Sequence, residues 1–169
     1  MAEKESFRTK EREAQIVSLH ESHVKEAEDR LARAMNGRVV VRGKEMPFIQ
    51  SRQGLAKHFL DASFTDVAVQ GWRMFSQEIV TRSGRHRHQG GLTIYVLQGR
   101  GYTMTDGVRQ DWEEGDLLLL PIKPGGVDHQ HFNLRPDGPS RWLAMIYLHF
   151  FDILCSEMVQ VENHPDWKE

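Results

Sequence analysis

The sequence predicts an all-β domain, in which antiparallel strands close into a barrel, with an N-terminal α-helical extension. Three observations predict this arrangement. Turn signals at residues 106–107 and 114–116 separate the apolar runs of residues 92–120, which is the pattern of consecutive β-hairpins. Segments rich in histidine lie before and after these hairpins. Residues 3–36 contain neither proline nor glycine and are rich in charged residues and alanine, as helices are.

We expect four segments along the chain. They are an N-terminal helical extension at residues 1–37, a connecting segment at 38–65 with a strand at 38–42 and a short helix at 55–62, the β-barrel at 66–155 and a C-terminal tail at 156–169. Val17, Val24 and Leu31 recur every seven residues along the helix and form a narrow apolar stripe. Such a stripe suits packing on the barrel or on a partner's helix, and a fully solvated helix is the alternative.

The composition excludes several classes of function. The 169 residues carry a formal net charge of −2, which favours neither nucleic acid nor a membrane as a partner. The single cysteine, Cys155, excludes an intrachain disulfide and fits a reducing compartment, and no apolar run approaches the roughly 18 residues of a membrane span. We therefore expect a cytoplasmic protein that acts on a small molecule and forms a homodimer or a higher homo-oligomer.

Four histidines indicate a metal site. Side chains alternate between the two faces of an extended strand, so His86 and His88 share one face with Cβ atoms roughly 6 to 7 Å apart. The same rule places His129, His131 and Asn133 on one face of a second strand. Imidazoles from both strands can meet at one ion through bonds of about 2.1 Å, and three such ligands leave positions open for other molecules. Parity alone allows either His129 or His131 as the third ligand.

These residues resemble the two motifs of the cupin superfamily. Cupins carry a His-x-His pair followed by a glycine, and later a glycine, a proline, and a histidine and an asparagine four residues apart. The matching residues in this sequence are His86, His88, Gly99, Gly115, Pro121, His129 and Asn133. The resemblance implies a double-stranded β-helix, or jelly roll, and its motif spacing favours His129 as the third metal ligand beside His86 and His88.

The position of the usual glutamate ligand, four residues after His88, holds Leu92. Loss of that carboxylate is similar to the gentisate 1,2-dioxygenase branch of the cupins, whose ferrous iron is held by three histidines. This resemblance implies a non-haem Fe(II)-dependent dioxygenase that oxidises or ring-cleaves a phenolic or aromatic carboxylate with O₂. In such an enzyme we expect His131 to act as a base or as a neighbour of the metal ligands, and Asn133 to orient neighbouring groups.

Other metals and other functions stay open at this point. Zinc, manganese or nickel also bind histidine, and a redox-inactive metal would give an isomerase, a decarboxylase or a hydrolase. A non-catalytic, ligand-sensing cupin in which the helix is the working element is a third hypothesis. Glu78, on a neighbouring strand, is a candidate for a further ligand.

The residues after the first histidine pair predict the character of the substrate. Leu92, Ile94 and Val96 follow the histidines inward by parity, and an apolar wall favours a flat, apolar or aromatic molecule. Three arginines crowd the entrance loop: Arg82, Arg85 and Arg87. Because arginine binds carboxylates bidentately, an arginine of this group is a candidate to hold an acidic end of the substrate, and arginines that are merely solvated are the alternative.

Overall fold

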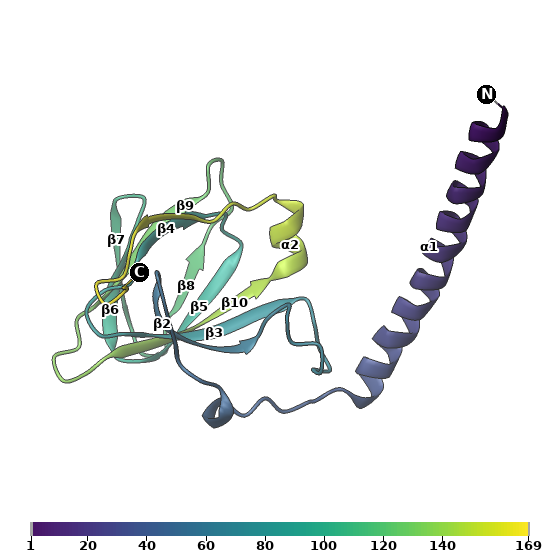
Figure 1. Cartoon of the computed structure of the whole chain (residues 1–169). Coiled ribbons are helices and arrows are strands. Elements are labelled where there is room, and N and C mark those ends of the chain that lie inside the picture. The colour runs from purple at the N-terminus through teal and green to yellow at the C-terminus, as the bar shows by residue number, and fades with distance from the viewer. Residues whose placement is uncertain (1, 169) are drawn as a thin grey trace. The chain divides into compact units, whose positions relative to one another are not determined.

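The computed structural model describes residues 2–168, with the side chains of residues 2–11, 13–15 and 17 left outside that description. The chain forms two compact units. One is a helical unit that runs to Val39 and includes Asp66–Val69, and the other contains Val40–Thr65 and the chain from Gln70 onward. Figure 1 shows the chain as a cartoon, with labels on most of its helices and strands.

The helix of the first unit, α1, spans Ala2–Asn36. It ends at Gly37, whose amide donates back to the last helical turn at 2.7 Å, as is common where glycine follows a helix. Beyond this point the chain makes an isolated β-bridge between Arg38 and Val67. The strand predicted for residues 38–42 is therefore wrong, because two of its three valines are exposed to solvent and pair with no described strand.

Charged side chains on α1 form ion pairs one turn apart, between Lys25 and Asp29 and between Glu26 and Arg30. Such pairs stabilise a helix by only about 0.2–0.5 kcal/mol each. Of the predicted apolar stripe, Val24 and Leu31 are exposed, and the side chain of Val17 lies outside the described residues. Among the described residues, neither helix combines the length and apolarity that crossing a lipid bilayer requires.

Two antiparallel sheets make up the second unit (Figure 1). The first has six strands, in the spatial order β1 (Ile49–Ser51), β2 (Gly54–Leu60), β3 (Trp72–Ile79), β10 (Ser140–Tyr147), β5 (Leu92–Gln98) and β8 (Leu117–Leu120). The second has five, in the order β11 (Val159–Glu162), β4 (Arg85–His88), β9 (Val127–Asn133), β6 (Arg100–Thr105) and β7 (Val108–Glu113). A 3-10 turn, η1 (Gly43–Glu45), precedes β1, and helix α2 (Leu148–Ile153) follows β10. The predicted mostly-β architecture with an N-terminal helix is confirmed.

The core lies between the two sheets and is built by alternation along the central strands. On β5, Leu92, Ile94 and Val96 are buried while Tyr95 and Leu97 are exposed. The buried apolar cluster combines residues of both sheets: Ile79, Leu92, Ile94, Leu120, Val127, Trp142, Ala144 and Ile146. Because fully burying each large apolar side chain stabilises the fold by about 1.5–3 kcal/mol, this cluster holds the two sheets face to face.

Two segments outside the central strands differ from expectation. The helix predicted at residues 55–62 is wrong, since β2 pairs with β3 and places Leu55 opposite Glu78. Apolar residues in so short a run fit a helix and a strand equally well, and the sheet partner decides between them. Part of the predicted C-terminal tail also joins the fold, because β11 pairs with β4 in the five-stranded sheet.

Candidate metal centre

The two histidine-bearing strands, β4 and β9, are neighbours in the five-stranded sheet, and His86 lies directly opposite His129. Alternation turns His86 and His88 inward, where they are 6% and 5% exposed, while the intervening Arg87 faces solvent. The turn before β9 packs tightly against β4. A Cβ on Gly126, whose φ is +76°, would lie 2.7 Å from the carbonyl oxygen of His88, so only glycine allows this approach.

Three imidazole rings converge where the strands meet. The ring centroids are 4.3 Å apart for His86 and His129, 4.7 Å for His88 and His129, and 5.3 Å for His86 and His88. One nitrogen from each ring lies within 4.8 Å of the others. A shared ion at about 2.1 Å from each nitrogen calls for separations of roughly 3.0–3.5 Å, so the rings are grouped nearly as one ion would hold them. Among the described residues this group consists of histidines alone.

Backbone carbonyls determine which nitrogen of each ring carries the proton. The Nδ1 atoms lie 3.3 Å from the oxygen of Gly84 for His86, 2.7 Å from that of Gln89 for His88, and 3.1 Å from that of Val127 for His129. A carbonyl oxygen only accepts hydrogen bonds, so Nδ1 is the donor in each neutral ring. Nε2 then keeps its lone pair, which is how a histidine is prepared to bind a metal.

Burial keeps these three rings neutral. Loss of solvent, followed by the neighbouring His88, lowers the pKa of His86 to about 4. Burial, followed by the other histidines, holds the pKa of His129 well below its usual value, and burial likewise lowers the pKa of His88. At neutral pH a metal therefore has no proton to displace from Nε2. Three neutral nitrogen donors suit a divalent transition metal, and the cluster is a candidate site for one.

His131 lies next along the same face of β9 but outside the three-ring group. Its Nδ1 is 2.7 Å from the hydroxyl of Thr103, which accepts a hydrogen bond from Nε1 of Trp112 at 3.0 Å. Thr103 is fully buried, and its hydroxyl has no other acceptor among the described residues, so we infer that it donates to His131. The proton of His131 is then on Nε2, which makes this ring a donor and not a metal ligand. Burial lowers the pKa of His131 to about 3, so the ring is neutral.

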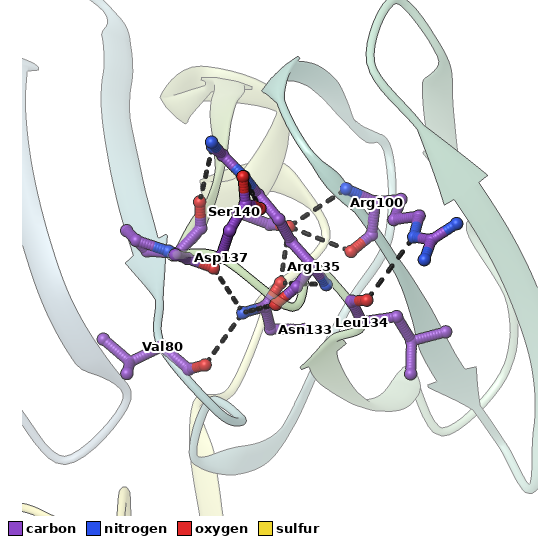
Figure 2. Close-up of polar contacts among 9 residues, drawn as sticks. Val80, Arg100, Asn133, Leu134, Arg135, Asp137 and Ser140 are labelled. Atoms are coloured by element: carbon purple, nitrogen blue, oxygen red, sulfur yellow. Dashed lines mark hydrogen bonds and ion pairs between the residues drawn. The ribbon is translucent and has the colours of Figure 1, made fainter.

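Asn133, at the end of β9, holds the loop that follows the strand (Figure 2). Its amide nitrogen donates to the carbonyls of Val80 at 2.8 Å and Gly138 at 2.9 Å. Its oxygen accepts from the amide of Arg135 at 2.9 Å and from the hydroxyl of Ser140 at 2.7 Å. The side chain is not among those that line the cavity beside the histidines. We infer a structural role for Asn133 in place of the role in the site that its motif position implied.

The histidines open into a cavity of about 240 Å³ between the two sheets. Its wall includes the apolar and aromatic side chains of Phe75, Leu92, Ile94, Trp142, Ala144 and Ile146. Val96 is buried but does not line this cavity. Glu78 is absent from the wall too, because it lies on the other face of β3 and pairs with Arg141. We therefore infer that Glu78 is not a ligand.

The arginines singled out in the sequence are engaged elsewhere. Arg82 pairs with Glu162 at 2.6 Å, Arg85 pairs with Asp128 at 2.7 Å, and Arg87 is exposed. The cavity instead contains Arg73 of β3, which forms an ion pair with Asp61 at 2.9 Å, and it also contains His58 of β2. Sequence reasoning missed Arg73 because polar and apolar side chains occur on both faces of β3, so its inward face was not identifiable. It missed His58 because residues 55–62 were predicted as a helix.

Comparison with known proteins agrees with the fold. Residues 77–146 match the family model of the cupin domain, and no curated protein matches the sequence of the chain. A cupin-like protein from Thermotoga maritima is similar in structure, with 16% identity and a TM-score of 0.52 over 70% of this chain and 90% of that chain. The polyketide cyclase RemF from Streptomyces resistomycificus has 16% identity and a TM-score of 0.53 over 78% of this chain and 87% of that chain.

A salicylate 1,2-dioxygenase from Pseudaminobacter salicylatoxidans is also similar, with 20% identity and a TM-score of 0.50. The match covers 68% of this chain but only 33% of the dioxygenase, so the chain spans about a third of that enzyme. Likeness at these identities shows the fold alone, and the enzymes involved catalyse different reactions. Residues 77–146 therefore match the cupin domain, and the buried histidine cluster within the two antiparallel sheets is a candidate metal centre.

Proposed function

We propose that this protein is a non-haem Fe(II)-dependent dioxygenase that oxidises or ring-cleaves a small phenolic or aromatic carboxylate with O₂. The observation that supports this proposal is the donor set of three neutral imidazoles, each with Nε2 free, and no carboxylate in the group. His86, His88 and His129 would hold the iron. Bound there, ferrous iron supplies the redox chemistry that O₂ requires, with coordination positions left open by a three-ligand set.

The residues around the histidines bind the substrate and exclude water. The rings of Phe75 and Trp142 meet edge to face with centroids 5.7 Å apart, and both line the cavity. Aromatic and aliphatic walls favour a flat ring and disfavour bulk water. His131 donates from Nε2 to an oxygen of the substrate, and the hydrogen bond from Thr103 keeps the ring in the orientation this requires.

Reconstitution with Fe(II) in the absence of oxygen tests the proposal. After air is admitted, O₂ uptake is measured with salicylate, gentisate and related hydroxybenzoates, alongside the ultraviolet absorbance of the aromatic ring. With the iron-loaded protein, we expect O₂ uptake and loss of the ring absorbance for at least one compound. With the zinc-loaded protein, we expect neither change for any compound. Absence of uptake across the panel would contradict the dioxygenase.

The competing function uses the same three histidines without O₂. Zinc or manganese would act as a Lewis acid in an isomerase, a decarboxylase or a hydrolase. Metal analysis of the purified protein separates the two, because tightly bound zinc, with no activity gained on exchange for iron, favours the redox-inactive enzyme. The homo-oligomer and the cytoplasmic location stay predictions.

A further inference from the structure

The cavity beside the histidines has a second polar group, made by His58, Asp61 and Arg73. His58 lies on β2 and Arg73 on β3, so this group comes from the six-stranded sheet, whereas the histidine cluster belongs to the five-stranded sheet. All three residues precede residue 77, where the match to the cupin domain begins. The family motifs therefore carry no information about this part of the cavity.

Arg73 is held in place by one carboxylate. Its Nε donates to Asp61 at 2.9 Å, and the two side chains are 35% and 25% exposed. No other hydrogen bond of this guanidinium occurs among the described residues, so the edge formed by its two terminal nitrogens is free. That edge is the fork that pairs with a carboxylate through two parallel hydrogen bonds. Because Asp61 fixes the fork in advance, little side-chain entropy is lost when an anion binds.

Arg73 and the histidine cluster face the same cavity. The side chain of Arg73 lines its wall together with the rings of His86, His88 and His129. A small molecule with two polar groups is suited to contact both.

Aromatic rings line the same cavity. His58 stacks on Phe75 with centroids 5.2 Å apart and an interplanar angle of 21°, and Phe75 meets Trp142 edge to face. The volume of about 240 Å³ is smaller than the roughly 300–1,000 Å³ of sites for drug-sized ligands. Such a space suits a single ring with short substituents.

We propose that Arg73, held by Asp61, binds the carboxylate of a small single-ring substrate whose other polar group faces the histidines. Arg73 is then the residue that sets specificity for an acid over its neutral analogue. The inference rests on the proposed function for what happens at the metal, but the anion-binding role of Arg73 is independent of it.

The test compares two probes of nearly equal shape and different charge, salicylate and salicylamide. Binding to the full chain loaded with zinc is measured by titration calorimetry, so turnover plays no part. Arg73→Gln removes the charge, and Arg73→Lys keeps the charge but loses the fork. Arg141→Gln is the matched control, because Arg141 is also paired with a carboxylate in the same sheet, on the outer face away from the cavity. Thermal unfolding verifies that each variant is folded.

We expect the unsubstituted protein to bind salicylate more tightly than salicylamide. Arg73→Gln should weaken salicylate binding by about 10-fold to 100-fold and salicylamide binding by less than about threefold, with Arg73→Lys in between. Arg141→Gln should leave both unchanged. A preference for salicylate that survives Arg73→Gln, an equal loss in Arg141→Gln, or no binding of salicylate would each overturn the proposal.

Failure of this inference and failure of the proposed function give different results. A protein that shows the Arg73-dependent preference but consumes no O₂ with iron keeps its anion site and loses the dioxygenase assignment. A protein that consumes O₂ while Arg73→Gln binds salicylate normally keeps the dioxygenase and loses the anion site.

Discussion

The group beside Nδ1 of an imidazole decides which of the two ring nitrogens carries the proton. A carbonyl oxygen can only accept a hydrogen bond, whereas a hydroxyl group can also donate one. Beside the carbonyl, Nδ1 must be the donor and Nε2 is left with a lone pair, as in His86, His88 and His129. Beside the Thr103 hydroxyl, Nδ1 of His131 is the acceptor and Nε2 carries the proton. Strand parity alone allows either His129 or His131 as the third ligand, and the neighbouring groups favour His129.

Replacement of one ligand tests this assignment at the residue scale. His129→Ala removes one of three nitrogens, and we expect the affinity for zinc to fall at least about a hundredfold, because even the partners that orient a ligand are worth 10-fold to 100-fold. His149→Ala is the control, since His149 is exposed and outside the cluster. Competition with a chromophoric chelator measures both. Retention of tight zinc by His129→Ala, together with its loss in His131→Ala, would reverse the roles of the two histidines.

At the scale of single elements, Asn133 joins the end of β9 to the start of β10. Its side-chain nitrogen donates hydrogen bonds to Val80 and Gly138, and its side-chain oxygen accepts hydrogen bonds from Arg135 and Ser140. These hydrogen bonds hold the intervening loop (Figure 2). We expect Asn133→Ala to lower the free energy of unfolding by about 2–4 kcal/mol, because several partners lose their hydrogen bonds at once.

Zinc affinity of the folded Asn133→Ala variant should match that of the unsubstituted protein, since the side chain is outside the cavity. Urea unfolding and the chelator titration measure the two quantities separately. Asn133→Asp is the informative companion variant, because it keeps the acceptor oxygen and loses the donors. Its free energy of unfolding should lie between those of the unsubstituted protein and Asn133→Ala. An unchanged free energy of unfolding combined with weaker zinc binding would contradict the structural role and show that Asn133 acts at the metal site.

The strands were predicted correctly where the alternation of side chains and the residues of the flanking turns both indicated a strand. The strands that carry the histidines follow a two-residue alternation between glycine-containing turns, and the structure brings His86, His88 and His129 together. Residues 55–62 show the limit, because their apolar spacing fits a helix, and only the pairing of β2 with β3 makes them a strand. The same ambiguity hid Arg73, since the inward face of β3 depends on which strands flank it. The position of Arg73 in the site therefore depends on pairing between strands distant in the sequence, which the local sequence pattern does not reveal.

At the scale of the whole molecule, the fold encloses four neutral histidines between its sheets: His86, His88, His129 and His131. In the unfolded chain each has a pKa near 6.5. Burial lowers every one of these values in the folded chain, to about 4 for His86 and about 3 for His131. Between these values and about pH 6.5 the unfolded state binds more protons than the folded state, so acidification favours unfolding.

The stability of the metal-free protein should therefore fall as the pH drops below about 6.5, by about 1.4 kcal/mol per pH unit for each histidine that stays neutral in the fold. Above that pH these four residues contribute no slope. Urea unfolding at pH 8, 7, 6 and 5 measures the effect, and the range ends before most carboxylates titrate. His131→Gln should reduce the dependence of the free energy of unfolding on pH by the contribution of one histidine, about 1.4 kcal/mol per pH unit. A metal-free protein equally stable at pH 7 and pH 5 would mean that these rings reach solvent or take up protons within the fold, and the neutral donor set would be lost with them.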